Sequence, residues 1–335
     1  MRYLITGTAG FIGFHLAKRL LEEGHEVAGV DGMTPYYDIN LKKDRHAKLE
    51  RFASFQAHYF MLEDWEGLVH VAKPFRPDVV VHLAAQAGVR YSLENPRAYI
   101  QANIVGSFNI MELCREVKPR HLLIASTSSV YGMNTSSPLR ETSSSDYPLT
   151  TYAATKKSVE TLAHCNAHLW GIPTTILRFF SVYGPWGRPD MALFRFVQNI
   201  LAGQPIDIYN RGQMQRDFTY VDDVIEAVVR LADCVPDKSE GEEGMASGGW
   251  SKVAPYRVVN VGSARPVGLL DLVEEIERAL GVQARRNYMD MQLGDVVRTE
   301  AAAELLERLI GYRPSTPMSK GVREFVAWYR SYYQA

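Results

Sequence analysis

Short apolar runs alternate along the chain with longer stretches in which apolar residues recur every three or four positions. Ile12, Leu16 and Leu20 show the second pattern, and their spacing predicts a helix with one face packed on a sheet. The apolar runs lie at residues 3–5, 27–30, 78–83, 121–125 and 174–178. Such runs between helices are typical of strands buried on both faces of a parallel sheet. The pattern therefore predicts an α/β protein with a doubly wound, Rossmann-type parallel sheet.

Three further segments complete the expected elements. Residues 95–117 and 149–169 are predicted to be helices that flank the sheet, and residues 320–333 predict an amphipathic terminal helix. Residues 236–254 are rich in glycine, serine and acids, so we expect a mobile loop there.

A glycine-rich turn connects the first apolar run to the first helix. Gly7, Gly10 and Gly13 let the backbone approach a pyrophosphate, and the helix N-terminus supplies free amide donors. Asp31 follows the second apolar run, where an acid binds the ribose hydroxyls of a dinucleotide. The carboxylate would repel a ribose phosphate, so NAD is favoured over NADP.

The sequence pattern changes after Tyr183, where a segment rich in glycine and proline precedes shorter predicted helices and strands. We therefore expect an NAD-binding domain at residues 1–182 and a mainly substrate-binding, smaller α/β domain at residues 183–335. Segments near 216–232 and 256–264 are expected to return to the first domain.

Tyr152 and Lys156 lie four residues apart in the predicted helix 149–169, so their side chains share one face. A free phenol has a pKa of about 10, and a neighbouring cation lowers it by favouring the phenolate. The pair is a candidate proton-transfer base, and a packing role is the alternative for this spacing taken alone.

Hydroxyl side chains, from Ser126 to Ser129, follow the apolar run 121–125 at a point where a parallel strand delivers residues to a ligand crevice. One of them could hydrogen-bond both a sugar hydroxyl and the Tyr152 phenolate. A polar turn is the alternative interpretation of this cluster.

The composition excludes several classes of partner. Lysine and arginine number 37 against 38 aspartates and glutamates, which leaves no basic surface for nucleic acid. No apolar run reaches the length of a membrane span. The three cysteines lack the spacing of metal ligands. We expect a cytoplasmic protein with no metal, nucleic-acid or membrane partner.

Taken together, these motifs resemble the extended short-chain dehydrogenase/reductase family and, within it, the UDP-glucuronate 4-epimerases. The resemblance covers nearly the whole chain, and the segments that carry it are residues 7–13, 82–92, 125–132, 152–156, 178–192 and 215–220.

The resemblance implies a tightly bound NAD and a cycle in which the sugar is oxidised at C4, turns in the pocket, and is reduced on its opposite face. Tyr152 would be the base, Thr127 the hydroxyl that relays or positions the proton, and Lys156 the residue that lowers the Tyr152 pKa. The implied cofactor contacts are Gly7, Gly10, Phe11, Ile12, Gly13, Asp31, Leu83, Ala84, Ala85, Tyr152 and Lys156.

Two features favour a glucuronate within this family. Related dehydratases and decarboxylases carry an acid after the catalytic Thr or Ser, whereas this chain has Ser128 and Ser129 there. A glucuronate oxidised at C4 becomes a β-keto acid that tends to lose carbon dioxide, so an epimerase must hold the carboxylate. The hydroxyls of Ser128, Ser129 and Ser181 and the guanidinium of Arg188 are the candidates.

The resemblance also places Arg216, Arg298 and Asp295 on the nucleotide, the arginines at the diphosphate and the acid at the ribose. Arg90 is expected near the phosphates, and Asn103 is expected to face the same crevice.

Two residues are set apart from these assignments. Many relatives carry an Asp at the position of Met61, so the contact to the adenine stays open. His82 is expected to be a packed, hydrogen-bonded core histidine and not a catalytic one.

The leading hypothesis is conversion of UDP-glucuronate to UDP-galacturonate. A UDP-glucuronate decarboxylase and a neutral UDP-hexose 4-epimerase are the alternatives, and Ser128, Ser129 and Arg188 argue against both. A non-catalytic NAD-binding regulator is the least favoured, because the Tyr, Lys and hydroxyl groups are intact. Relatives are commonly homodimers paired through helices at 95–117 and 149–169.

Overall fold

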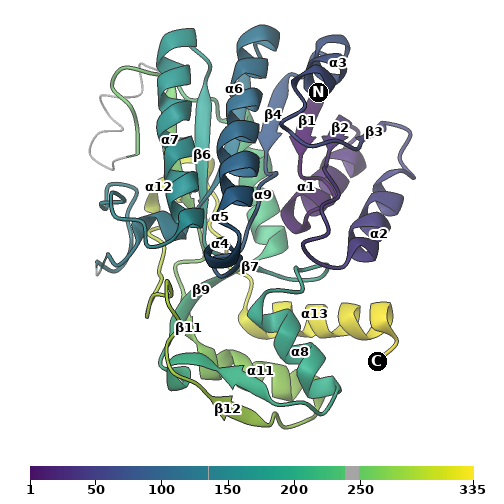
Figure 1. The fold of residues 1–335 in the computed structure, drawn as a ribbon, viewed down its shortest axis with the longest axis vertical. Helices are drawn as coiled ribbons and strands as arrows, with labels where there is room; N and C mark the ends of the chain where they lie inside the picture. The colour runs from purple at the N-terminus through teal and green to yellow at the C-terminus, as the bar shows by residue number, and fades with distance from the viewer. Residues whose placement is uncertain (135, 238–248) are drawn as a thin grey trace.

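The computed structural model describes residues 1–134, 136–237 and 249–335, and its centre is a seven-stranded parallel sheet (Figure 1). Its strands run in the order β10-β6-β5-β4-β1-β2-β3, so the sequence order reverses between β1 and β4. Their bounds are β1 (Arg2–Thr6), β2 (Glu26–Val30), β3 (Phe55–His58), β4 (Val79–His82), β5 (His121–Thr127), β6 (Thr174–Phe179) and β10 (Tyr256–Val261). The predicted doubly wound parallel sheet is confirmed.

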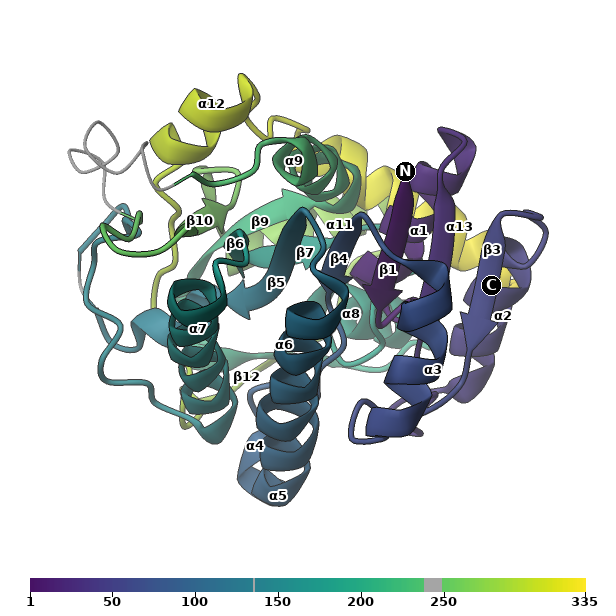
Figure 2. The same cartoon turned by 90° about the horizontal axis from the view of Figure 1, so that it is seen from above.

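Helices cover both faces of this sheet (Figure 2). One face packs against α3 (Trp65–Phe75), α6 (Gly106–Val117) and α7 (Thr151–Trp170), and the other against α1 (Phe11–Glu22) and α9 (Val221–Asp233). Because side chains alternate along each strand, the sheet separates two apolar cores. The remaining helices of this part are α2 (Ile39–Leu49), α4 (Tyr91–Glu94), α5 (Pro96–Tyr99) and α12 (Glu304–Ile310).

Two small sheets form the lower part of the molecule in Figure 1. One has the order β11-β9-β7, with β7 (Ser181–Tyr183), β9 (Gln215–Tyr220) and β11 (Pro266–Gly268). The other pairs β8 (Ile206–Ile208) with β12 (Arg286–Tyr288) in parallel. The helices beside them are α8 (Ala192–Leu201), α11 (Leu269–Leu280) and α13 (Met318–Tyr333), and short turns of helix are η2 (Ser128–Tyr131) and η3 (Tyr209–Gly212).

Most predicted elements agree with the structure. The segment 149–169 is α7, and 320–333 lies within α13. The segment 95–117 is α5, η1 (Ile100–Val105) and α6 in succession, and η1 is a π-helical stretch that the periodicity did not predict. The expected loop 236–254 lies largely outside the described residues, which omit 238–248.

Candidate active site

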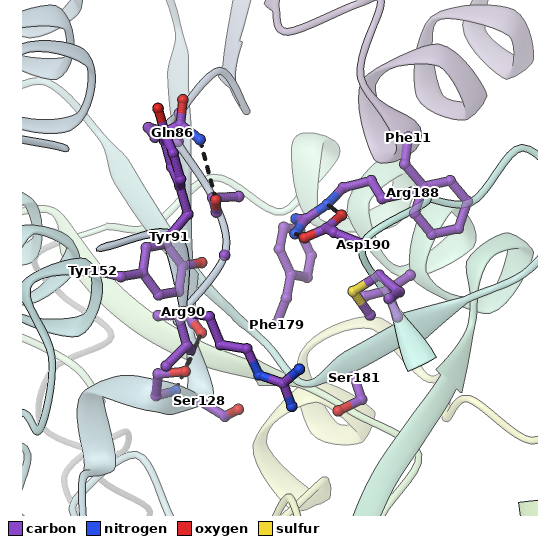
Figure 3. Close-up of a pocket in the computed structure, with 18 of the residues that line it drawn as sticks. Phe11, Gln86, Arg90, Tyr91, Ser128, Tyr152, Phe179, Ser181, Arg188 and Asp190 are labelled. Atoms are coloured by element: carbon purple, nitrogen blue, oxygen red, sulfur yellow. Dashed lines mark hydrogen bonds and ion pairs between the residues drawn. The ribbon is translucent and has the colours of Figure 1, made fainter. Parts of the chain in front are cut away.

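A cavity of about 1000 Å³ opens at the carboxyl ends of the parallel strands, where α/β sheets bind their ligands (Figure 3). The residues that follow β1, β2, β4 and β5 all contribute to its wall. All site residues expected from the sequence except Asn103 line it: Gly7, Gly10, Phe11, Ile12, Gly13, Asp31, Leu83, Ala84, Ala85, Arg90, Thr127, Ser128, Ser129, Tyr152, Lys156, Ser181, Arg188, Arg216, Asp295 and Arg298.

The glycine turn at one end of the cavity leaves no room for side chains. A Cβ on Gly13 would lie 2.1 Å from the Gly7 carbonyl oxygen, and a Cβ on Gly7 would lie 2.8 Å from the Ala84 nitrogen. Gly7 also has a φ of +83°, which disfavours other residues. Gly10 is the N-cap of α1 and carries no capping side chain, so the first amides of the helix stay available to an anion. These features fit a dinucleotide pyrophosphate.

Asp31 lies beside this turn at the end of β2. Its carboxylate accepts hydrogen bonds from the backbone amides of Ala9 (3.0 Å) and Met33 (2.8 Å), which fixes it at the cavity wall. Met61 lines the cavity nearby, and its sulfur packs so closely on Gly32 that a Cβ there would lie 2.2 Å from it. A thioether is a weak hydrogen-bond acceptor, so Met61 is a poor substitute for the carboxylate that many relatives carry at this position.

Helix α7 carries the proposed base and its lysine. Thr150 caps the helix by accepting from the Ala153 amide at 3.3 Å, so the first turn, with Tyr152, is held at the cavity. Lys156 lies one turn later, is 3% exposed, and donates to the Ala125 carbonyl at 3.0 Å. Burial lowers the pKa of Lys156 to about 8, and Glu160 acts in the opposite direction.

The electrostatics of Tyr152 differ from the sequence-based expectation. Burial raises the pKa of Tyr152 above its ordinary value. The Arg188 guanidinium and then the Thr127 hydroxyl act to lower this pKa, and the Asp190 carboxylate acts to raise it. Arg188 is thus a cation that favours the phenolate and that the sequence analysis did not assign to this role, and the role expected of Lys156 stays a prediction.

The hydroxyl cluster begins where β5 ends. Thr127 donates to the Ser129 hydroxyl at 3.2 Å and accepts from the Ser129 amide at 3.2 Å, so it also caps the short helix η2. Ser128 lies in η2, and Ser181 begins β7 on the other side of the pocket (Figure 3). Since a hydroxyl has one proton to donate, Thr127 can turn from Ser129 to a Tyr152 phenolate.

Arg188 does not stand free in the cavity. Its Nε and Nη2 atoms donate to the two oxygens of Asp190 at 2.9 and 2.6 Å. The Tyr36 hydroxyl donates to the same carboxylate at 3.2 Å. The expected carboxylate-binding arginine therefore has one edge occupied by a protein partner that the sequence analysis missed.

The residues expected at the nucleotide lie at the other end of the cavity. Arg216 donates to the backbone carbonyls of Gln215 and Val297, and its pKa is lowered by burial and raised by Asp295. Arg298 donates to Glu300 at 3.0 Å, an ion pair that takes part of its hydrogen-bonding capacity. The Arg90 guanidinium lies 4.5 Å from the centre of the Tyr209 ring, which also lines the cavity.

Two further expectations have clear outcomes. Asn103 does not line the cavity; it is fully buried and is bonded to the backbone of Gln86 and to Thr155, so its expected position facing the crevice is wrong. His82 is the expected core histidine, hydrogen-bonded to Thr6 and Ser107, each at 2.8 Å. Burial lowers its pKa to about 3, which keeps it neutral.

A buried ion pair that sequence reasoning missed holds α7 against the sheet. Arg178 on β6 binds both oxygens of Glu160 at 2.9 and 2.7 Å, and Ser126 donates to Glu160 at 2.6 Å. Glu160 lies two helical turns after Tyr152, so the pair fixes the rotation of α7. The sequence feature that could have revealed this pair is the carboxylate of Glu160, placed two helical turns after Tyr152.

A second missed residue is Arg45 on α2, which is 0% exposed. It donates to the Ala9 carbonyl of the glycine turn at 2.7 Å and to the carbonyls of Trp186 (2.5 Å) and Gly187 (3.3 Å). It thereby connects the turn at the cofactor end to the loop that carries Arg188.

Comparison with known proteins matches residues 3–243 to a profile described as the NAD dependent epimerase/dehydratase family. The chain belongs to this family. Among its relatives is a Rhizobium meliloti protein named probable UDP-glucuronate 4-epimerase, 56% identical over all of this chain and 98% of that protein. Protein CapI of Staphylococcus aureus is 51% identical over the full length of both.

The fold of this family member also matches a solved structure. The crystal structure of UDP-glucuronic acid 4-epimerase from Bacillus cereus in complex with UDP-glucuronic acid and NAD has a TM-score of 0.88 and 32% identity. The match covers 99% of this chain and 100% of that one. Within the described residues, no helix has both the length and the apolar content for crossing a membrane, and no cluster of potential metal ligands occurs.

Proposed function

We propose that this protein is an NAD-dependent epimerase that converts UDP-glucuronate to UDP-galacturonate by inverting C4, without loss of carbon dioxide. The observation that carries the proposal is that Tyr152, Thr127 and Arg188 line the same cavity as the glycine turn. The names of the Rhizobium meliloti relative and of the Bacillus cereus structure support the substrate.

The cofactor end of the cavity fits NAD. Gly7, Gly10 and Gly13 would let the pyrophosphate lie against the first turn of α1, and the Asp31 carboxylate would accept hydrogen bonds from the ribose hydroxyls. Phe11, Ile12, Leu83, Ala84 and Ala85 supply the remaining walls. When bound, NAD would supply the redox chemistry of the cycle, accepting the C4 hydrogen as a hydride and later giving it back.

The protein's own part in the cycle is proton transfer. Tyr152 Oη accepts the proton of the sugar 4-hydroxyl while Thr127 holds that hydroxyl, and Lys156 lies one turn along α7 to bind the cofactor ribose. After the 4-keto sugar has turned and presents the opposite face of C4 to the nicotinamide, the same phenol would return the proton to the C4 oxygen. No net oxidation results.

Retention of carbon dioxide depends on how the carboxylate of the keto acid is held. The Ser128, Ser129 and Ser181 hydroxyls and the Arg188 guanidinium surround the sugar end of the cavity and can bind it. No carboxylate occupies the Ser128–Ser129 stretch, where related dehydratases and decarboxylases place one. Arg216, Arg298, Asp295 and Arg90 would bind the nucleotide.

The decisive experiment incubates the purified protein with UDP-glucuronate without added NAD and separates the products by anion-exchange chromatography. UDP-galacturonate is the expected product. UDP-pentose with carbon dioxide would instead identify a decarboxylase, and turnover of UDP-glucose alone would identify a neutral hexose epimerase. A protein that binds NAD but converts none of these sugars would be the non-catalytic regulator.

The proposal extends to organisation. Residues 1–182, with returning segments near 216–232 and 256–264, would form the NAD-binding domain, and residues 183–335 mainly the sugar-nucleotide domain.

A cytoplasmic homodimer is expected. Pairing through η1 and α6 is supported by the exposed apolar side chains on these helices, Ile100, Val105 and Phe108. Light scattering after size exclusion would test the dimer.

A further inference from the structure

The Arg188 side chain is held by two residues from different parts of the chain. Asp190 binds it with two hydrogen bonds, at 2.9 and 2.6 Å, and Tyr36 donates to Asp190 at 3.2 Å. All three side chains line the cavity, and Figure 3 shows Arg188 and Asp190 facing each other across the pocket from Tyr152.

The surrounding backbone makes room for this arrangement and fixes it. A Cβ on Gly88 would lie 2.4 Å from the Tyr36 hydroxyl, so the glycine allows Tyr36 to reach Asp190. Arg45 binds the carbonyls of the two residues before Arg188, and the Met191 amide donates to the Arg188 carbonyl at 3.1 Å. The Arg188 residue is therefore held both at its backbone and at its guanidinium.

The occupied edge decides how Arg188 can meet an anion. A guanidinium offers paired donors on two edges, one formed by Nε and Nη2 and the other by Nη1 and Nη2. Asp190 takes the first edge. Among the described residues, Nη1 has no hydrogen-bond partner in the protein, so the second edge is the one left for a ligand. The Asp190 carboxylate also repels a second carboxylate from the edge it occupies.

We propose that Asp190, braced by Tyr36, is a positioning residue that presents the Nη1–Nη2 edge of Arg188 to the substrate carboxylate. This inference rests on the proposed function, because it takes the sugar acid as the ligand. It makes Asp190 a determinant of specificity for an acidic over a neutral sugar.

The test measures binding of UDP-glucuronate and UDP-glucose to the NAD-loaded protein by titration calorimetry, for the wild type, Asp190→Asn, Arg188→Ala and the double variant. Asp190→Asn should weaken UDP-glucuronate about tenfold, since charge-assisted hydrogen bonds hold the guanidinium. UDP-glucose should change less than about twofold. In the Arg188→Ala background, Asp190→Asn should have no further effect on either ligand, because Asp190 acts through Arg188.

Matched variants exclude general effects. Tyr36→Phe removes the hydroxyl that donates to the Asp190 carboxylate and should weaken binding of UDP-glucuronate about threefold. This variant tests the inference if Asp190→Asn does not fold. Asp233→Asn and Tyr59→Phe remove an exposed Asp–Arg pair and a tyrosine hydroxyl outside the cavity, and should leave both affinities unchanged.

Three results would overturn the inference. Tighter binding of UDP-glucuronate by Asp190→Asn would mean that Asp190 competes with the substrate for Arg188. Equal weakening of both ligands, or an undiminished effect of Asp190→Asn in the Arg188→Ala background, would show a general structural role. If the wild type epimerises UDP-glucuronate but the effects of Asp190→Asn and Arg188→Ala on its binding are simply additive, this inference alone is refuted. A wild type that binds the sugar without epimerising it refutes the proposed function alone.

Discussion

Replacing Tyr152 by phenylalanine removes the one phenol that faces the pocket from the first turn of α7. The ring keeps its edge contact with Tyr99, whose centre lies 6.0 Å away, and Thr127 keeps its hydrogen bond to Ser129. No buried protein donor loses its last partner, so the free energy of unfolding should change by less than about 1 kcal/mol. The effect should therefore appear in turnover and not in folding.

The magnitude follows from the chemistry of the lost group. General acid–base catalysis contributes about 10²–10⁴-fold, and Tyr152 is asked to act in both half-reactions, so kcat should fall at least about 10³-fold. NAD should copurify as in the wild type, because the glycine turn, Asp31 and Lys156 are untouched. Absorbance of the reduced nicotinamide should no longer appear when UDP-glucuronate is added.

The assay compares initial rates of UDP-galacturonate formation with NAD content and thermal denaturation of the same preparations. Tyr59→Phe is the matched control, since its hydroxyl binds Glu50 away from the cavity. If Tyr152→Phe kept a tenth of the wild-type rate, the assignment of the base would be refuted. If it lost NAD or unfolded, the lost rate would say nothing about proton transfer, and Thr127→Val, expected to lose about 10²-fold, would then test the same step.

Three other predictions concern charge and space. Arg188→Met removes the cation that lowers the Tyr152 pKa, so the acid limb of the kcat/KM profile should move to higher pH; an unmoved limb would contradict the electrostatic assignment. Gly13→Ala places a Cβ 2.1 Å from the Gly7 oxygen, and the variant should purify without NAD. Full retention of NAD would refute the assignment of the glycine turn to the pyrophosphate. Burial raises the pKa of Glu141 from 4.5 to about 7, so the protonated carboxyl stabilises the fold below about pH 4.5 and this stabilisation is lost as pH rises through about 7. In denaturant titrations the wild type should lose up to about 3 kcal/mol of unfolding free energy over this range, and Glu141→Gln should not. Parallel pH curves for the two proteins would contradict this prediction.

Much of the site was readable from the sequence because its parts are local. The glycine turn, the i, i+4 pair of Tyr152 and Lys156, and the hydroxyls after β5 each span a few residues. Parallel strands deliver their carboxyl ends to one edge of a sheet, so the apolar runs alone predict that these motifs meet. The cavity wall agrees with that expectation.

Other parts of the site were beyond sequence reasoning because they depend on contacts between distant segments. Asn103 was expected at the crevice, yet it is buried beneath Gln86, since the rotation of a helix on its neighbours decides which polar residue faces a ligand. The Arg178–Glu160 pair was missed for a similar reason. Its partners lie on β6 and α7, and only their packing brings the charges within 2.7 Å.

The sequence by itself determined the α/β class, the dinucleotide turn and the residues capable of proton transfer, because backbone sterics and side-chain periodicity act over short distances. The tertiary structure alone decided which polar groups meet: the Tyr36 hydroxyl with the Asp190 carboxylate across 154 positions, and the Arg45 guanidinium with the Trp186 carbonyl across 141. Electrostatic interactions fall off with distance in space and take no account of distance along the chain. For that reason Arg188, from a loop after β7, acts to lower the pKa of Tyr152 across the pocket, although the two residues are far apart in the sequence.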